Sequence, residues 1–389
     1  MKILYVTFEK PSKYYGGGIC IIQSLESIGA FGDIDYIGLP FDKSQTGSLN
    51  ITKTSFLGKY KNPFAVVINM LRGLPSFYYH DWKKIIKKVD PDEYDLVYTD
   101  FSHHDFVIKW AKKHGLKVIT RVHNIESDMN ETVRKSKKFS HFKLRAMLNG
   151  KSVFRREKRT MELSDEIIFL TQNDLSRAQA LYGENILSRS HIVPICIDIS
   201  VPVEPVNPVG KQYVLATGSL SYGANAEGIL WLVEKVWGNV CNKEEFADTY
   251  LLVAGANPSE ELEAACNGVP RCLLVKNPPD IGIYFDSAQF YLAPIFSGAG
   301  MKVKVAEALL HGLKVVGTSH SLIGYESSAD FTYQADTPED FIGGMTEFIK
   351  SFSSADREDC RKNALEYYSV DCSIKAFGKI IDSNLQGEK

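Results

Sequence analysis

The stretch AQFYLAPIFSGAGMKVKVAEALLHGLKVVGTS, residues 288–319, contains the pattern that decides the fold. It begins with an apolar run typical of a strand and passes through a turn containing Gly298 and Gly300. Apolar residues then recur at helical spacing as far as Gly312, and a β-branched run, LKVVGT, follows at once. Strand, helix and strand in this order predict two parallel strands joined by a helical crossover.

The same alternation extends along most of the chain. The strand-like runs of the first half are KILYVTF, DIDYIGLP, DLVYTDF, LKVITRV, DEIIFLT and SHIVPI, and those of the second half are YVLATGS, TYLLVAGA, RCLLVKN, AQFYLAP and LKVVGT. This pattern predicts an α/β fold of two doubly wound parallel-sheet domains of the Rossmann type. A ligand is then expected in a cleft between the domains, at the carboxyl ends of the strands.

The length of 389 residues suits two cores of about 150–200 residues each. Four prolines between positions 194 and 208 interrupt the alternation, so we place a linker at residues 195–211. The N-terminal domain is then residues 1–194, completed by a C-terminal helix near 373–386. The C-terminal domain is residues 212–372.

Composition excludes several classes of protein. The chain has 45 Lys and Arg against 47 Asp and Glu, which gives no general electrostatic basis for nucleic-acid binding. Its seven cysteines are scattered without a C-x-x-C pair, as expected of reduced thiols in a cytoplasmic protein. The start, MKILYVTF, is expected to be the first strand and not a signal peptide. No run reaches the roughly 18 apolar residues that span a bilayer, so any membrane contact is expected to be peripheral.

Polar and glycine residues follow several predicted strands. Gly16, Gly17 and Gly18 open a helix after the first strand, where they favour phosphate binding, although a flexible turn explains them equally well. The fourth strand runs into TRVHNIESDMNE, and such a polar cluster is costly at a strand end unless it binds something. The candidates there are Arg121, His123, Asn124 and Glu126, and DFSHHD at the neighbouring edge adds Asp100 and His103 as acceptor-side candidates.

In the second domain, Gly218 and Ser219 end a strand, and the 297–312 segment carries most of the chemistry. Glycines before a helix expose its first N–H groups to an anion, and Lys302 and Lys304 add positive charge, so the turn is expected to hold a diphosphate. Glu307 shares a helix face with Lys304 and is expected to accept hydrogen bonds from ribose hydroxyls. An intrahelical Lys–Glu pair is the alternative, but it leaves the glycines unexplained.

Taken together, these motifs resemble the retaining glycosyltransferases of the B fold (GT-B), in the large group called group 1 or family 4. The resemblance rests on the glycine-rich first turn and on VHNIE, SDEIIFLTQND, IVPICID, TGSLSYGANAEGILWL, GAGMKVKVAEAL and GLKVVGT. It implies a UDP- or GDP-sugar donor in the C-terminal domain and a saccharide or polyprenyl-diphosphate-linked saccharide acceptor mainly on the N-terminal domain. It also implies a role in the synthesis of cell-surface polysaccharides or glycoconjugates.

The resemblance assigns roles to single residues. His123 is expected to face the transferred sugar, Glu307 to hold the ribose and Lys304 to act beside it, as the catalytic set. The backbone of residues 275–280, which includes Lys276, is expected to take the base. The donor-binding residues are Gly17, Gly18, Gly218, Ser219, Lys276, Gly298, Ala299, Gly300, Met301 and Lys302.

Two departures from the family pattern concern the donor phosphates. Ala299 stands where many relatives carry the first glutamate of an E-x7-E pair, which places the chain in a branch with G-x-G-x-[RK]-x-K-x-x-E-A. The stretch GSLSYGANAEG lacks the arginine and lysine that many relatives use against the diphosphate. The charge of the diphosphate then falls to Lys302 or Lys304, and the sequence leaves open which one.

For a retaining reaction, a pair of carboxylates flanking the sugar is one possible pattern, and none stands out at the strand ends. The family instead implies attack from the same face, with the leaving phosphate helping to deprotonate the acceptor. No D-x-D motif is placed to bind a divalent metal, so we expect neither a metal nor another cofactor.

The segment from Arg134 to Arg159 is the one local charge anomaly, with eleven Lys and Arg against Glu157 alone. Apolar residues interleave with these charges, which predicts a pair of basic amphipathic helices; contact with anionic lipid is one interpretation, and an ordinary solvated charged face is the alternative. The protein is therefore expected in the cytoplasm, peripherally on the inner face of the membrane.

Two other classes of protein remain open, and a third is disfavoured. A nucleotide-sugar 2-epimerase has the same fold, and a non-catalytic nucleotide-sugar binding subunit fits the alanine at 299 and the missing basic pair. A dinucleotide oxidoreductase is least favoured, because the first turn lacks its glycine fingerprint.

Overall fold

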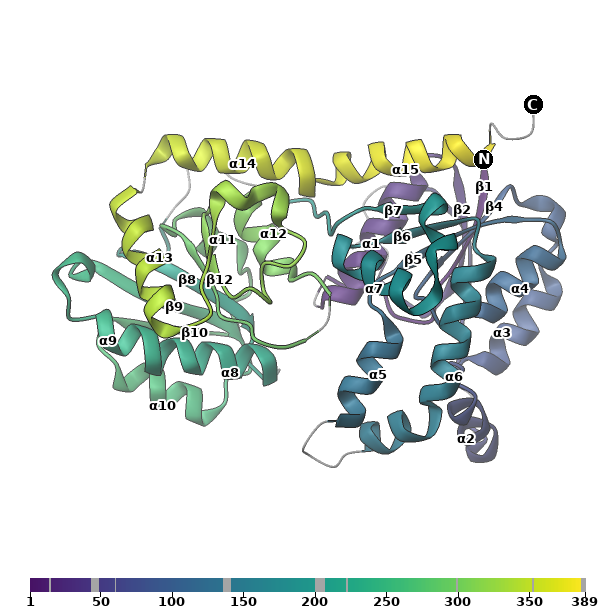
Figure 1. The fold of residues 1–389 in the computed structure, drawn as a ribbon, viewed down its shortest axis with the longest axis horizontal. Helices are drawn as coiled ribbons and strands as arrows, with labels where there is room; N and C mark the ends of the chain where they lie inside the picture. The colour runs from purple at the N-terminus through teal and green to yellow at the C-terminus, as the bar shows by residue number, and fades with distance from the viewer. Residues whose placement is uncertain are drawn as a thin grey trace. The chain divides into compact units, whose positions relative to one another are not determined.

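The computed structural model describes residues 1–13, 15–42, 49–59, 61–135, 141–199, 207–221, 223–298, 300–351 and 353–385. Ala299 and part of the expected linker therefore lie outside the described residues. The chain divides into two compact units, which we call the N-terminal unit, Met1–Ile195 with Val370–Lys389, and the C-terminal unit, Cys196–Ser369. Figure 1 shows the elements of each.

The N-terminal unit is built on a seven-stranded sheet whose strands are all parallel, in the order β3-β2-β1-β4-β5-β6-β7. The strands are β1 (Lys2–Val6), β2 (Asp33–Gly38), β3 (Ile51–Phe56), β4 (Leu96–Asp100), β5 (Lys117–Val122), β6 (Glu166–Phe169) and β7 (Ser190–Ile192).

Helices cover both faces of this sheet. Apolar side chains of α1 and α15 pack on one face in a core that includes Leu25 and Phe377, and those of α3 and α4 pack on the other with Trp82 and Ile108. The helices of the unit are α1 (Gly16–Gly29), α2 (Pro63–Leu71), α3 (Tyr79–Ile85), α4 (Asp105–Lys113), α5 (Glu126–Lys135), α6 (His141–Leu163), α7 (Gln172–Tyr182) and α15 (Val370–Leu385).

The C-terminal unit repeats the plan with a six-stranded parallel sheet in the order β10-β9-β8-β11-β12-β13. Its strands are β8 (Gln212–Ser219), β9 (Thr249–Ala256), β10 (Cys272–Lys276), β11 (Tyr291–Ala293), β12 (Val315–Gly317) and β13 (Thr332–Gln334). Its helices are α8 (Gly223–Trp231), α9 (Gly238–Val240), α10 (Glu260–Gly268), α11 (Gly282–Asp286), α12 (Val303–Leu310), α13 (Pro338–Ser351) and α14 (Ser354–Tyr368).

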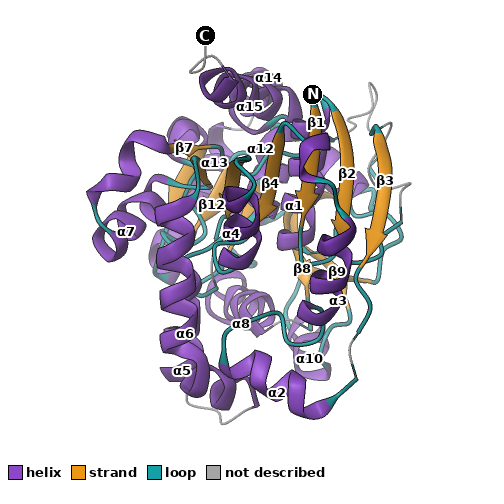
Figure 2. Cartoon of the chain, turned by 90° about the vertical axis from the view of Figure 1, so that its right-hand side faces the viewer, coloured by secondary structure: helices purple, strands orange, loops and turns teal. Residues whose placement is uncertain are grey.

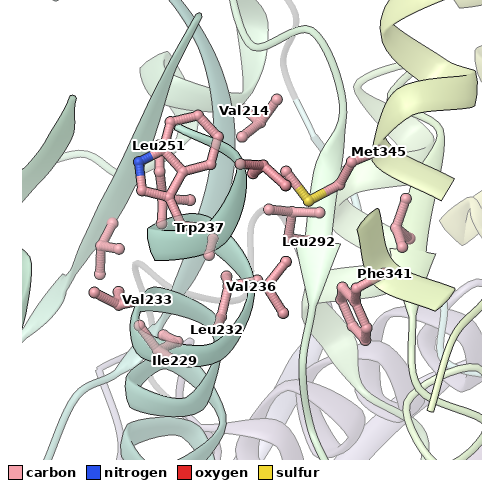
Figure 3. Packing of buried hydrophobic residues seen from close by; sticks show 14 of the residues in the cluster. Val214, Ile229, Leu232, Val233, Val236, Trp237, Leu251, Leu292, Phe341 and Met345 are labelled. Carbon is pink, nitrogen blue, oxygen red and sulfur yellow. The ribbon is translucent and has the colours of Figure 1, made fainter. Parts of the chain in front are cut away.

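The core of this unit forms where helix side chains meet the sheet. Figure 3 shows Trp237 and its neighbours beside Val214 of β8, Leu292 of β11 and Met345 of α13, and all four side chains are fully buried. Between α8 and α9 the chain continues as a π-helix, Leu232–Trp237. Short 3-10 turns complete the elements of both units: Ile86–Lys88, Pro91–Glu93, Glu184–Arg189, Glu244–Phe246 and Glu326–Phe331.

Both sheets have the strand order of a doubly wound Rossmann sheet, which confirms the expected fold class. In such sheets a ligand binds beyond the carboxyl ends of the two strands at which the order reverses. Those strands are β1 and β4 in the N-terminal unit and β8 and β11 in the C-terminal unit. The loops that follow them contain many of the candidate residues.

Several local expectations were wrong. β3 and β13 were not foreseen, and Arg121 lies inside β5 instead of past its end. The Arg121 side chain is fully buried, and its guanidinium donates to Ser24 Oγ and Gln23 Oε1, both at 3.0 Å, and to the carbonyl of Pro194 at 3.2 Å. Because these acceptors lie in the core, Arg121 does not face an acceptor site.

Candidate active site

His123 and Asp100 form a buried pair at the carboxyl ends of β5 and β4. His123 Nε2 lies 2.8 Å from Asp100 Oδ1, and neither side chain is exposed by more than 3%. The ring of Phe101 stacks on the imidazole with 4.3 Å between ring centroids. Phe101 adopts a φ of +70°, an unusual backbone conformation for a bulky residue and one that concentrates at functional sites.

The Asp100 carboxylate is held by donors on two further elements. Ser24 Oγ of α1 donates to Oδ1 at 3.2 Å, and the Tyr5 hydroxyl of β1 donates to Oδ2. Since Asp100 is completely buried, its carboxylate orients His123 and does not face solvent. This position differs from the open one expected for an acceptor-side residue.

The surroundings keep His123 positively charged. Burial lowers its pKa, but the neighbouring Asp100 and Cys20 side chains outweigh burial and raise the pKa to about 9. With Nε2–H directed at Asp100, the Nδ1 atom has no hydrogen-bond partner among the described residues. The imidazolium therefore has one buried N–H group with no acceptor among the described residues.

Glu126, the first residue of α5, lies next to this pair. Its side chain is 18% exposed, and its Oε2 is 3.9 Å from Nδ1 of His103. Burial and the charge of Glu157 raise the pKa of Glu126 to about 8, while burial and the charges of Arg145 and Arg156 lower the pKa of His103 to about 4. At neutral pH, Glu126 is therefore mostly protonated and His103 neutral.

Two residues that the sequence did not single out join this group. Glu9, just beyond β1, has its pKa raised by burial and lowered by the charges of His123 and Arg145. Arg145 of α6 also acts electrostatically on His103 and Glu126. We call Glu9, His103, His123, Glu126 and Arg145 the strand-end cluster. Asn124 lies half-buried beside it in sequence.

Glu157, also missed as a functional candidate, positions this cluster. Its carboxylate is fully buried on α6 and accepts hydrogen bonds from the backbone N–H groups of Glu126 at 2.8 Å and Ser127 at 2.9 Å. The hydroxyls of Ser102, Ser127 and Tyr182 donate to it at 2.5, 2.6 and 2.5 Å. The carboxylate thus caps the start of α5 and fixes the loop that holds His123. The sequence feature that could have pointed to Glu157 is its position as the only acidic residue between Arg134 and Arg159.

The glycine turn opens α1 as expected. A Cβ atom at Gly18 would collide with the Ser12 backbone, so only glycine fits this close approach. The N-cap residue Tyr15 makes no side-chain capping hydrogen bond. α1 follows β1, which is one of the two strands at which the strand order of the sheet reverses. The first amides of α1, which include Gly17, lie at this point of the sheet.

In the C-terminal unit, the loop after β11 has the conformation that its glycines permit. Gly298 has a φ of +107° and Gly300 a φ of +67°, both in the left-handed region that favours glycine. α12 begins at Val303, with Lys302 as its N-cap and with Met301 buried before it. The helix N-terminus thus follows directly on a turn built from glycine.

The charged residues of α12 pair with groups nearby. Lys304 Nζ lies 2.7 Å from Glu307 Oε2, with the two side chains 31% and 15% exposed, and Lys302 Nζ donates to the Gly300 carbonyl at 2.6 Å. The intrahelical pair that was the alternative interpretation therefore exists, and the glycine turn stands beside it. Lys304 therefore holds the Glu307 carboxylate in place without a bound ligand.

The remaining donor-side candidates lie at the ends of β8 and β10. Ser219 Oγ is 3.2 Å from Ser221 Oγ after β8, next to Gly218, and Lys276 pairs with Glu263 at 2.9 Å after β10. His320, which the sequence did not single out, lies against the Ser297–Gly298 backbone, and burial and Lys302 lower its pKa. Its sequence signal was its place three residues beyond β12.

A hollow opens between α8 and the loop after β11, at the point where the order of the second sheet reverses. Trp231 and Phe296 meet edge to face in it with 4.8 Å between ring centroids. Its other lining residues are Ala224, Glu227, Gly228 and Ser297. The candidate diphosphate turn therefore borders an open space.

The described residues contain no group of three or more His, Cys, Asp or Glu side chains arranged to hold a metal ion. Among them there is also no helix with the length and apolar character needed to cross a bilayer.

Comparisons with known proteins agree with this architecture. Residues 211–351 match the family described as Glycosyl transferases group 1. No curated protein sequence matches the chain. Similar solved structures include HepE of Anabaena in complex with UDP, at 13% identity and a TM-score of 0.69, covering 98% of this chain and 100% of that chain.

Two further structures show the same likeness. A glycosyltransferase from Rickettsia africae is 12% identical with a TM-score of 0.66, covering 100% of this chain and 99% of that one. The lipopolysaccharide outer core galactosyltransferase WaaB is 13% identical with a TM-score of 0.63, covering 99% and 100%. The chain has the GT-B fold, and residues 211–351 of its C-terminal unit match the family described as Glycosyl transferases group 1.

Proposed function

We propose that this protein transfers a sugar from a UDP- or GDP-sugar to a saccharide or lipid-linked saccharide acceptor, with retention of configuration at the anomeric carbon. The observation that carries the proposal is the turn of Gly298 and Gly300 leading into α12, with Lys302, Lys304 and Glu307 on its first two turns. This element combines a helix N-terminus, positive charge and a carboxylate at the spacing of a nucleoside diphosphate. UDP in the complex of HepE supports the same choice of ligand.

In the proposed donor complex, the diphosphate lies against the turn that includes Ala299, and Glu307 accepts hydrogen bonds from the ribose hydroxyls. Glu307 then exchanges its contact with Lys304 for the ribose, which leaves Lys304 to meet a phosphate oxygen. Gly17 and Gly18 contribute amides toward the phosphates, and residues 275–280, with Lys276, take the base through their backbone.

His123 is proposed to donate its Nδ1–H to an oxygen of the transferred sugar. A pKa of about 9 keeps the imidazole protonated near neutral pH, so it is a poor base for the acceptor hydroxyl. The acceptor proton is then taken by a leaving phosphate oxygen, as in attack from the same face. The role of the protein is to position the substrates and to stabilise the charge on the departing diphosphate.

We propose that Lys302, Lys304 and the N-terminus of α12 stabilise this charge in place of a divalent metal. Transfer should then continue in excess EDTA at a rate within about twofold of the untreated enzyme, because electrostatic stabilisation by fixed groups needs no exchangeable ion. The measurement is product formation with EDTA and, as a control, with EDTA followed by Mg²⁺. Loss of most activity in EDTA and its recovery with Mg²⁺ would contradict the proposal.

For the acceptor we propose a saccharide carried on a polyprenyl diphosphate or another lipid at the inner face of the membrane, for the synthesis of a surface polysaccharide or glycoconjugate. The basic residues of α6 support this choice, since Arg145 lies on that helix and acts on the strand-end cluster. Asn124, His103 and Glu126 remain the proposed acceptor-side residues. Asp100 is proposed instead to position His123.

The experiment is a thermal-shift screen of UDP- and GDP-sugars, followed by transfer assays with the donor that stabilises the protein. NMR of the product distinguishes retention from inversion at the anomeric carbon. Glu307→Ala should abolish transfer. Conversion of the donor to its epimer without acceptor would identify a 2-epimerase instead, and donor binding with no turnover against any lipid-linked saccharide would indicate a binding subunit.

A further inference from the structure

The short helix α2, with sequence PFAVVINML, exposes apolar side chains and buries its polar one. Phe64 is 80% exposed, and Val67, Ile68 and Leu71 are 48%, 47% and 40% exposed. The only buried residue of the helix is its one polar residue, Asn69. A surface helix ordinarily buries its apolar stripe and exposes its polar side chains, so the apolar face of α2 lacks the covering that such a face normally has.

This orientation is fixed by specific contacts. The Asn69 side chain donates to the Ser76 carbonyl at 3.3 Å. The backbone carbonyl of Asn69 accepts from the backbone N–H of Leu74 at 2.9 Å. On the α6 side, Ser152 Oγ donates to the Leu71 carbonyl at 3.0 Å and Arg156 Nε donates to the carbonyl that follows it at 2.6 Å. The buried polar groups thus anchor the helix, and its apolar face is left pointing outward.

α6 continues this apolar surface and adds positive charge. Figure 2 shows α2 beside the ends of α5 and α6 that lie farthest from the sheet, and Figure 1 places α2 against α6 in the same way. Exposed apolar side chains of α6 are Leu144, Met147, Leu148 and Phe154, and its exposed basic side chains include Arg145, Lys151 and Arg155. We call α2 together with these residues the α2–α6 face.

The two sequence segments that form and flank the α2–α6 face carry charges of one sign. Residues 57–78 and 141–156 contain no Asp or Glu, while Lys59, Lys61 and Arg72 flank α2 and are exposed. A bilayer with anionic headgroups offers both an apolar layer and negative charge over a broad area. An acidic protein partner would pair with the basic side chains. It would cover the exposed aliphatic and aromatic side chains less well than the apolar layer of a bilayer does.

We infer that the α2–α6 face docks on an anionic bilayer, with Phe64 and Ile68 of α2 entering the lipid and the cations of α6 meeting the headgroups. This inference extends the proposed membrane contact from the basic segment to α2, and it does not depend on sugar transfer. It also places lipid close to the strand-end cluster, because Arg145 belongs to both. A lipid-borne acceptor then reaches the site without leaving the membrane.

The test is flotation of the full chain with phosphatidylcholine vesicles, with and without phosphatidylglycerol. The protein should float with the anionic vesicles only. In the variant Phe64→Ser/Ile68→Gln, binding to those vesicles should fall about tenfold, because two inserted side chains are lost. Lys151→Gln/Arg155→Gln should reduce the preference for anionic vesicles. Leu365→Gln, which alters an apolar residue of α14 that is 44% exposed against 47% for Ile68, is the control and should bind like the unaltered protein.

Insertion is distinguished from adsorption by Phe64→Trp, whose added fluorescence should be quenched by brominated lipid, unlike that of Leu365→Trp. The inference is overturned if the unaltered protein does not float, or if Phe64→Ser/Ile68→Gln floats unchanged. It is also overturned if the face instead mediates a dimer in vesicle-free sedimentation that this variant dissociates. Stabilisation by UDP, measured on the same samples, reports separately on the proposed donor site and confirms that the variants are folded.

Discussion

At the scale of single residues, the pair of His123 and Asp100 sets the charge of the imidazole at the strand-end cluster. A histidine beside a substrate is often considered a base, but here a buried carboxylate 2.8 Å away keeps it protonated. Tyr5 and Ser24 hold that carboxylate in one orientation. His123 is therefore built as a donor of a charge-assisted hydrogen bond.

Replacing the carboxylate should expose this role. In Asp100→Asn, one of the two groups that raise the pKa of His123 is lost while burial remains, so the pKa should fall and less of the imidazole should be protonated near neutral pH. We expect kcat to fall by about 10²-fold, with the activity partly recovered at lower pH and with little change in UDP binding. The measurement is a kcat profile from pH 5 to 9, with Asp128→Asn on α5 as control. An unchanged pH profile would show that Asp100 is structural only.

The upward pKa shifts of His123 and Glu126 also predict how stability depends on pH. Each pKa is higher in the folded chain, at about 9 against 6.5 for His123 and about 8 against 4.5 for Glu126. The stabilisation from each group is complete below its unfolded pKa and is lost as the pH rises through its folded pKa. Between pH 7 and 9 the free energy of unfolding should fall, on the order of 3 kcal/mol.

Denaturant titrations at pH 7, 8 and 9 measure this decline. Glu126→Gln, which removes one of the two titrations, should have a slope smaller by about a third. His103 contributes little, since its pKa is about 4 in the folded chain and 6.5 in the unfolded chain, which leaves it mostly neutral in both states in this range. Equal slopes for the variant and the unaltered protein would mean that Glu126 is ionised throughout.

At the scale of elements, α5 depends on a cap supplied by another helix. The Glu157 carboxylate of α6 accepts from the first two amides of α5 and from three hydroxyls. Because α5 directly follows the loop that contains His123, the Glu157 carboxylate supports both the start of α5 and the candidate active site. Without the charge on Glu157, the start of α5 should fray and His123 should lose its fixed position.

Glu157→Gln should therefore destabilise the N-terminal unit by about 2–4 kcal/mol, since hydrogen bonds to a buried charge are replaced by weaker ones and one acceptor site becomes a donor. Hydrogen exchange should show faster exchange in residues 126–135 than in the sheet. Glu162→Gln, on an exposed part of the same helix, should change stability by less than about 0.5 kcal/mol. Equal effects of the two variants would refute the capping role.

The elements also show what the sequence could and could not predict. Buried parallel strands such as KILYV are continuous apolar runs, so their existence and the fold class could be read from the sequence. β3, ITKTSF, lies at the sheet edge and has four consecutive polar residues between its apolar ends, and β13 has three residues, so neither gives that signal. Arg121 looked exposed because of its charge, but buried acceptors on α1 satisfy it. The role of Glu157 depends on residues from 25 to 55 positions away, which no local pattern contains.

At the scale of the whole molecule, the candidate residues fall on two similar sheets. The N-terminal unit contains the titratable strand-end cluster, and the C-terminal unit contains the glycine turn and the charged helix α12. Each unit has its own buried core. Nucleotide binding and sugar recognition should therefore be separable by substitutions in one unit at a time.

UDP alone should stabilise the protein through α12. At 100 times its dissociation constant, a ligand adds about 2.7 kcal/mol, which corresponds to a Tm rise of about 5–10 °C for a unit of this size. In Glu307→Gln this rise should be mostly lost, because the amide is a weaker acceptor for the ribose hydroxyls. Glu347→Gln on the exposed face of α13 should retain the rise in Tm.

His123→Ala should also retain the response to UDP, and it should lose only the additional stabilisation that the complete nucleotide sugar gives over UDP. If His123→Ala abolished the response to UDP itself, or if Glu307→Gln preserved it, the nucleotide would have to be assigned to the other unit.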